Sequence, residues 1–362
     1  MRKTHFLLSM VAVCLMLVGC SSQPQDSPTG TVPSFSLAWS EYPSWSVFGV
    51  AAEKGLIDGA QGKLGPIEEK WGVDIVLRLA DYDSCITLYG NKVVDAACLT
   101  QLDSLAPSLG RPSVAVLPTS TSVGADACIV TGNVNVNDLK KTPTRGLEKS
   151  VSQYVFERCL AIQGENPKDF SFENMDPAAA SQALQTNQNN VESIMVWNPF
   201  VLQTLRTRPD SRVLFDSSVI PEEVIDCVVV GKDSLLEKPR GKDFACAVID
   251  AYYQVNNLLA NDSSRDETLV ALGANFCSLG LDDMKTVVQQ TRFYSTPDKA
   301  LALFRSEKFR NETMPDVVNF CVAHDIVPAD DSGAIRFGFD DPRSVLLNFS
   351  TEYIKQVQKS SN

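Results

Sequence analysis

Short apolar runs alternate with longer amphipathic stretches from residue 33 to about residue 231, and this alternation predicts an α/β fold. The runs expected to form strands are Ser34 to Trp39, Val73 to Leu79, Ala96 to Leu99, Ser113 to Leu117, Ala127 to Val130, Ile194 to Val196 and Val228 to Val230. The helices expected between them are Val47 to Gly55, Ser84 to Tyr89, Val151 to Gln163 and Ala178 to Thr186. Such an order is typical of parallel strands covered by helices.

The pattern changes after Gly231, where amphipathic stretches follow one another without strands between them. The helices expected in this C-terminal third are Asp243 to Ala260, Leu281 to Thr291, Pro297 to Phe304 and Met314 to His324. We therefore expect two lobes: residues 33–130 and 231–362 form lobe I, and residues 131–230 form lobe II, inserted into it. A cleft between two lobes is a common position for a small-molecule site.

The N-terminal segment predicts export. Arg2 and Lys3 precede an apolar run of about 13 residues, which is too short to cross a bilayer core, so residues 1–19 are typical of a signal peptide. The residues leading to Cys20 resemble the lipobox of bacterial lipoproteins, which implies that acyl chains on Cys20 anchor the protein to the membrane. An ordinary signal peptide that leaves Cys20 as a free thiol is the alternative. The polar residues 20–32 predict a flexible tether.

Composition narrows the classes of partner. Without Arg2 and Lys3, 30 basic residues face 44 acidic ones, a net charge of −14 that repels phosphate backbones and excludes nucleic acid. Eight cysteines follow the tether: Cys85, Cys98, Cys128, Cys159, Cys227, Cys246, Cys277 and Cys321. They form no C-x-x-C pair, and most lie in apolar strings, so we expect small buried core residues. Their even number also permits disulfides, with the pairing left open.

Polar and aromatic clusters follow the predicted strands, where ligands bind in open α/β sheets. The clusters are Trp39 to Trp45, Asp81 to Ser84, Thr100 to Asp103, Thr119 to Ser122 with Gly124 to Asp126, Ser150 to Tyr154, Val196 to Phe200, and Phe215 to Ser218 with Pro221 and Asp226. They contain no basic side chain but seven carboxylates: Glu41, Asp81, Asp83, Asp103, Asp126, Asp216 and Asp226. Because carboxylates accept N–H donors in pairs and rings cover planar cations, this favours a guanidinium-like or urea-like solute. An anion held by the backbone N–H groups of residues 150–152 stays an alternative.

In this order the clusters resemble the periplasmic solute-binding proteins of the taurine, nitrate and thiamine-precursor superfamily, over about residues 33–356. Within it, the resemblance is strongest to the urea carboxylase-associated binding proteins. The features that carry it are Ala38 to Ser40, Leu99-Thr100 with Asp103 to Leu105, Ser150 to Ser152, Trp197 to Pro199, Phe215 to Ser218 with Ile220-Pro221 and Ile225-Asp226, Phe293-Tyr294 before Pro297, and Thr313-Met314. The resemblance implies a two-lobed periplasmic-binding-protein fold of type II, ABC permease subunits as partners, a place on the periplasmic side of the membrane, and a urea-, guanidine- or amide-like solute. Asn198 departs from the family pattern, which often has a glutamate there.

The residues expected to form the ligand site are Trp39, Glu41, Tyr42, Tyr82, Thr100, Asp103, Asp126, Ser150, Ser152, Trp197 and Asp226. Each has a purely structural alternative. The carboxylates of Asp103, Asp126 and Asp216 can cap helices or turns, the serines can cap the helix after residue 150, and Trp197 can be a core aromatic. For Asp226 a functional role is favoured, because it lies in an apolar string where an unpaired carboxylate would be unfavourable.

Catalytic motifs are absent from the sequence. After the leader there is one histidine, His324, which is typical of a helix end, and there is no G-x-S-x-G, H-E-x-x-H or G-x-G-x-x-G pattern. We therefore expect no catalytic residue, metal or cofactor. Two alternatives stay open: an enzyme acting on a small amine, since thiamine-pyrimidine synthases share the fold that the resemblance implies, and a sensory lobe that docks a receptor.

Overall fold

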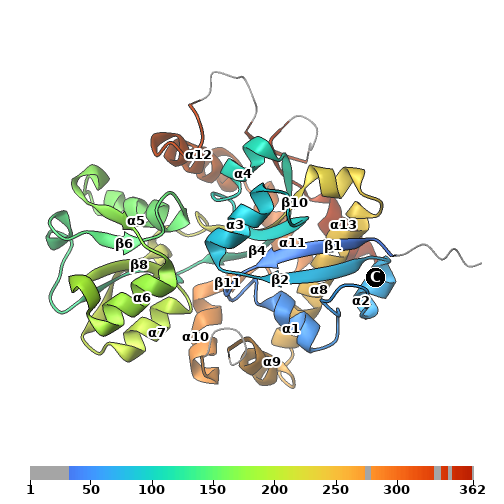
Figure 1. The fold of residues 1–362 in the computed structure, drawn as a ribbon, viewed down its shortest axis with the longest axis horizontal. Coiled ribbons are helices and arrows are strands. Elements are labelled where there is room, and N and C mark those ends of the chain that lie inside the picture. The colour runs from blue at the N-terminus through green and yellow to red at the C-terminus, as the bar shows by residue number, and fades with distance from the viewer. Residues whose placement is uncertain (1–31, 274–278, 330–335, 341–344, 361–362) are drawn as a thin grey trace, which may run out of the picture. The chain divides into compact units, whose positions relative to one another are not determined.

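The computed structural model describes residues 32–273, 279–329, 336–340 and 345–360 (Figure 1). The predicted leader, Cys20 and Cys277 lie outside these ranges. The strands are β1 Ser34–Trp39, β2 Asp74–Leu79, β3 Ala96–Thr100, β4 Ser113–Ser122, β5 Asp126–Thr131, β6 Thr144–Gly146, β7 Phe172–Asn174, β8 Ser193–Trp197, β9 Ser211–Asp216, β10 Ile225–Gly231, β11 Thr291–Phe293, β12 Phe337–Phe339 and β13 Leu347–Phe349. The helices are α1 Val47–Glu53, α2 Pro66–Trp71, α3 Tyr82–Gly90, α4 Leu105–Gly110, α5 Val151–Ile162, α6 Pro177–Thr186, α7 Phe200–Thr207, α8 Gly241–Ala260, α9 Arg265–Leu272, α10 Leu281–Gln290, α11 Pro297–Arg305, α12 Met314–Ala323 and α13 Glu352–Ser360.

The strands form two sheets, and we call each sheet with its helices a lobe. The first lobe contains strands in the order β12-β13-β4-β10-β3-β1-β2, with β11 paired to β4. The second lobe contains the order β7-β6-β8-β5-β9 and the helices α5, α6 and α7, drawn in green in Figure 1. The helices from α8 onward make the C-terminal third mostly helical. The predicted two-lobed α/β fold is thus confirmed.

The chain crosses between the sheets twice, through residues 123–125 after β4 and through residues 217–224 before β10. Consequently β5 belongs to the second lobe and β10 to the first. The chain passes from one sheet to the other several residues earlier than the predicted limits at 130 and 230. The outgoing strand β4 and the returning strand β10 lie side by side and therefore run antiparallel, as do β5 and β9. The sheets are mixed for this reason: they add antiparallel pairs to the parallel strands that the sequence pattern indicated.

Local sequence signals explain where the helices next to the cleft begin. The Asp81 side chain accepts a hydrogen bond from the Ser84 N–H and starts α3, and Asp176 caps α6 through the Ala179 N–H, with Pro177 at the first helical position. Ser150 caps α5 in the same way through the Ser152 N–H. These caps fix the residues at which α3, α5 and α6 begin.

The seven cysteines that the structure describes are all buried and carry free thiols. Burial raises the pKa of Cys85, Cys128, Cys159, Cys246 and Cys321 to about 12. The predicted core role is confirmed for these seven residues. Within the described ranges, no helix is both long enough and apolar enough to span a bilayer.

Candidate ligand-binding site

The site begins where three strands of the first sheet share one edge. Asp226, near the start of β10, pairs with Thr100 at the end of β3 and with Ser120 near the end of β4. Because β10 runs antiparallel to both neighbours, its first residues lie beside the carboxyl ends of β3 and β4. This is the edge at which open α/β sheets bind ligands.

A small cavity, here called the chamber, lies at this edge. It is lined by Tyr42, Trp45, Tyr82, Thr100, Asp126, Val151, Trp197, Val224 and Asp226. Its volume of about 10 Å³ leaves room for roughly one water-sized group. None of these lining residues is basic, and two of them are carboxylates. A third carboxylate, Asp103, accepts hydrogen bonds from the lining residues Tyr82 and Thr100 and lies directly behind them.

Asp226 is the most perturbed of the three carboxylates. Its side chain is buried, and burial raises its pKa far above the usual range, with the Asp126 carboxylate adding to the effect. The Ser120 hydroxyl donates a hydrogen bond to it, and the Tyr42 hydroxyl beside it also acts to lower the pKa, without offsetting the burial. A cation in the chamber would supply the charge that these neutral donors lack.

Asp103 forms a hydrogen-bonded unit with two chamber residues. Its Oδ2 accepts from the Tyr82 hydroxyl at 2.8 Å and from the Thr100 hydroxyl at 2.9 Å, and the backbone N–H of Val151 in α5 also favours its ionised form. Burial outweighs these bonds and raises its pKa to about 6. Because Val151 belongs to the second lobe, this carboxylate also links the two lobes across the chamber.

Asp126 starts β5, immediately after the first crossing. A hydrogen bond from the Ser122 side chain favours its ionised form, and Ser122 in turn contacts the Ser217 hydroxyl at 2.6 Å. Burial nevertheless raises the pKa of Asp126 to about 6, with Asp103 contributing as a like charge. Asp126 and Asp226, which follow the two crossings, therefore line the chamber, and Asp103, which follows β3, lies directly behind it.

Aromatic rings form a continuous wall of the chamber. The Tyr42 and Trp45 rings are 4.8 Å apart, Trp45 stacks on Tyr82 at 5.3 Å with an interplanar angle of 18°, and Tyr82 meets Trp197 edge-on at 5.6 Å. The Trp45 Nε1–H is buried and has no hydrogen-bond partner among the described residues. Such rings can cover a planar or cationic group.

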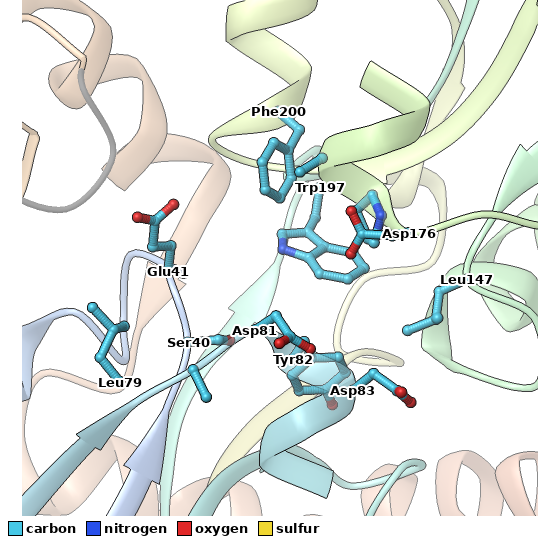
Figure 2. Close-up of a pocket in the computed structure, with 13 residues that line it drawn as sticks. Ser40, Glu41, Leu79, Asp81, Tyr82, Asp83, Leu147, Asp176, Trp197 and Phe200 are labelled. Carbon is cyan, nitrogen blue, oxygen red and sulfur yellow. The ribbon is translucent and has the colours of Figure 1, made fainter. Parts of the chain in front are cut away.

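A larger cleft, here called the vestibule, adjoins the chamber and is shown in Figure 2. Its volume is about 410 Å³, and Tyr82 and Trp197 line both cavities. The first lobe contributes Ser40, Glu41 and Leu79 to Asp83, and the second lobe contributes Leu147, Asp176 to Ala178, Trp197 and Phe200. Four of these side chains are carboxylates and none is basic.

The predicted site residues occupy different places. Tyr42, Tyr82, Thr100, Asp126, Trp197 and Asp226 line the chamber, Glu41 lines the vestibule, and Asp103 lies behind the chamber. Ser150 is a helix cap that also donates to the Leu147 carbonyl. Ser152 is buried next to Val151 but lines neither cavity, and Trp39 is likewise absent from both linings. Asp216 caps the turn at Ser217–Val219.

Several lining residues were missed by the sequence analysis. Trp45 and Phe200 stand inside the quoted clusters, so their aromatic character was an available signal. Val151 and Val224 carry no chemical signal, because apolar residues line sites and cores alike. Asp176 is recognisable only as a helix cap. In the part of the chain that the structure describes, no group of three His, Cys, Asp or Glu side chains is arranged to hold a metal ion.

Comparison with known proteins identifies the fold. No protein-family model and no curated protein sequence matches the chain. Among solved structures, the aliphatic sulphonate-binding protein SsuA of Escherichia coli aligns with a TM-score of 0.62 and 15% identity, over 82% of this chain and 89% of that one. The alkanesulfonate-binding protein SsuA of Xanthomonas axonopodis bound to MOPS gives 0.65 and 14% over 83% and 96%. The nitrate-binding protein NrtA of Synechocystis gives 0.61 and 13% over 91% and 89%. The chain therefore has the periplasmic-binding-protein fold.

Proposed function

We propose that this protein is the extracytoplasmic solute-binding component of an ABC importer and that it captures a small, nitrogen-rich cation between its lobes. The observation that carries the proposal is the buried group Asp103, Asp126 and Asp226 around a chamber whose lining has no basic residue. Guanidine-like solutes suit this group best, and urea-like or amide-like solutes, which bring N–H donors without charge, rank below them.

Electrostatics favour a cation over sulfonate and nitrate, the anions for which the similar structures are named. Because burial raises the pKa values of Asp103 and Asp126 to about 6, ionising these side chains costs more beside the chamber than in water. A cation with several N–H donors reverses this balance, because it supplies both the opposite charge and the missing hydrogen bonds. A sulfonate or nitrate would instead add a like charge.

Calorimetry on the chain from Ser21 onward tests the solute class. Guanidinium and methylguanidine should bind more tightly than urea and acetamide, and taurine and nitrate should not bind. A saturating solute at about 100 times its dissociation constant should also raise the unfolding free energy by roughly 2.7 kcal/mol. Tight binding of taurine or nitrate without any response to guanidinium would overturn the proposal. Formation of a product from a bound solute would favour the enzymatic alternative.

Anchoring and delivery belong to the same proposal. Acylation of Cys20 would hold the protein at the membrane, where it meets the permease subunits. Cys20→Ser should therefore move the protein from the membrane fraction to the soluble fraction or halt its processing. A substituted protein that stays on the membrane and still incorporates labelled fatty acid would contradict the anchor.

A further inference from the structure

We infer that the solute is an elongated dication, with one cationic head in the chamber and a second positive end among the carboxylates of the vestibule. Linear diamines and guanidino-amines are the chemical class that fits. This inference rests on the proposed function and makes it more specific.

The sizes of the two cavities give the first argument. The chamber of about 10 Å³ admits roughly one water-sized group, whereas the vestibule of about 410 Å³ adjoins it through the shared residues Tyr82 and Trp197. In this conformation only one N–H-bearing group of a solute fits inside the chamber, either an ammonium head or one nitrogen of a guanidinium. The rest of any larger solute must therefore lie in the vestibule.

The lining of the vestibule matches an alkyl arm that ends in a positive charge. Apolar surface comes from Leu79, Ala80, Leu147, Pro177 and Ala178, and the rings of Trp197 and Phe200 join it. The carboxylates Glu41, Asp81, Asp83 and Asp176 lie around this surface, with Glu41 drawn on one side of Trp197 and Leu147 on the other in Figure 2. Apolar walls with acidic groups and no base favour a flexible organic cation over a metal ion or a neutral solute.

A buried hydroxyl gives a second, independent argument. Ser40 follows directly after β1, is 4% exposed and lines the vestibule, and its Oγ has no hydrogen-bond partner among the described residues. A buried polar group without a partner is unfavourable unless a ligand supplies one. An N–H donor on the arm or its cationic end would satisfy this oxygen.

Two carboxylates can be removed without disturbing the helix caps. Asp81 and Asp176 cap α3 and α6, so their substitution would alter the fold. Glu41 and Asp83 cap no helix, and partial burial raises the pKa of Glu41, as expected for a carboxylate without a nearby cation. The double variant Glu41→Gln/Asp83→Asn therefore tests the vestibule alone.

The probes are putrescine and n-butylamine, which share a four-carbon chain and differ by one cationic end. Putrescine should bind at least tenfold more tightly to the natural protein. In Glu41→Gln/Asp83→Asn this advantage should fall to about threefold or less, because putrescine loses more affinity than n-butylamine does. The control Glu192→Gln/Glu312→Gln removes two exposed carboxylates outside the vestibule and should keep the full advantage. Added salt should also reduce the advantage, because exposed charges are screened.

The outcomes separate the two proposals. Equal binding of putrescine and n-butylamine, or an advantage that survives in Glu41→Gln/Asp83→Asn, would overturn the dication and leave the cation chamber intact. A tighter response to guanidinium than to either amine would also overturn it. Failure of every cation to bind would instead remove the proposed function together with this inference.

Discussion

Asp226 is the residue on which solute binding should depend most. Asp226→Asn replaces a charged acceptor with an amide of half the acceptor capacity, and the loss of a charged hydrogen bond costs roughly 1.5–3 kcal/mol. We expect the dissociation constant for the cation to rise about tenfold or more by calorimetry. The melting temperature of the solute-free protein should stay equal or rise, because ionising a buried, raised-pKa carboxyl opposes folding. An unchanged dissociation constant with a lower melting temperature would make Asp226 structural and leave Glu41 or Asp103 as the leading contacts.

Asp250 provides the matched control for this variant. It is also buried, but its carboxylate accepts hydrogen bonds from Lys70 at 2.7 Å, from the Trp71 Nε1–H at 2.8 Å and from Gln254 at 3.0 Å. Burial acts to raise the pKa of Asp250, and these donors outweigh it and lower the pKa. Asp250→Asn should therefore lower the unfolding free energy and leave solute binding unchanged.

At the residue scale, the sequence predicted a site residue correctly where a charged side chain stands among apolar neighbours. Asp226 was predicted because a carboxylate interrupts an apolar string, and it lines the chamber. Trp39 was predicted from the same cluster as Trp45, but only Trp45 lines the chamber: Trp39 is the last residue of β1, and Trp45 lies beyond the turn that follows. Which of two nearby aromatic residues faces a cavity depends on this turn, and no pattern in the sequence encodes it.

At the scale of elements, the return crossing is held from both lobes. The Gln101 side chain donates to the Glu223 carbonyl at 2.6 Å and accepts from the Ile225 N–H at 2.8 Å. From α5, Arg158 donates to both carboxylate oxygens of Glu223, at 2.8 and 2.9 Å, and the Tyr154 hydroxyl adds a bond at 2.9 Å. These bonds fix the crossing just before Asp226.

Glu223→Gln should weaken the hydrogen bonds that Arg158 and Tyr154 donate to the return crossing. Burial acts to raise the pKa of Glu223, but Arg158 and Tyr154 outweigh it and lower the pKa, so the carboxylate stabilises the fold above its unfolded pKa. We expect the unfolding free energy at pH 7 to drop by about 1 kcal/mol, a modest value because Arg158 is one-third exposed. The difference between variant and natural protein, measured by urea unfolding, should hold down to about pH 4.5 and shrink as the pH falls further through the lowered folded-state pKa. A constant difference at all pH values would contradict the ion pair.

The elements themselves were predictable to different degrees. β1 and α5 follow strong periodic patterns and form almost as expected. β4 was predicted to end at Leu117 but continues to Ser122, because the hydroxyls of Thr119 and Ser120 bond to Ser44 and the hydroxyl of Ser122 bonds to Ser217, which stabilises a polar run inside the protein. Strands β6 and β7 have three residues each, too few for a period to show.

For the whole molecule, the chamber predicts an unusual dependence of stability on pH. The pKa values of Asp103 and Asp126 are raised to about 6, so between about pH 4 and 6 the solute-free folded protein holds protons that the unfolded chain has released. The unfolding free energy should therefore fall as the pH rises through this window, by about 3 kcal/mol for a single such carboxyl. Urea unfolding at pH 4 and pH 7.5 measures the fall, and Asp103→Asn/Asp126→Asn should reduce it, with the contribution of Asp226 remaining. A stability that is flat or higher at pH 7.5 would contradict the raised pKa values.

The buried thiols make it possible to measure how often the regions around them open. A thiol with a pKa of about 12 does not react with iodoacetamide until its surroundings open, so the rate of alkylation reports how often each region opens. Cys128 and Cys159 belong to the second lobe, and Cys85, Cys98, Cys227 and Cys246 belong to the first. In a Cys277→Ser background, mass spectrometry of peptides after timed labelling would therefore give the opening rate of each lobe separately, using only thiols that the protein already carries.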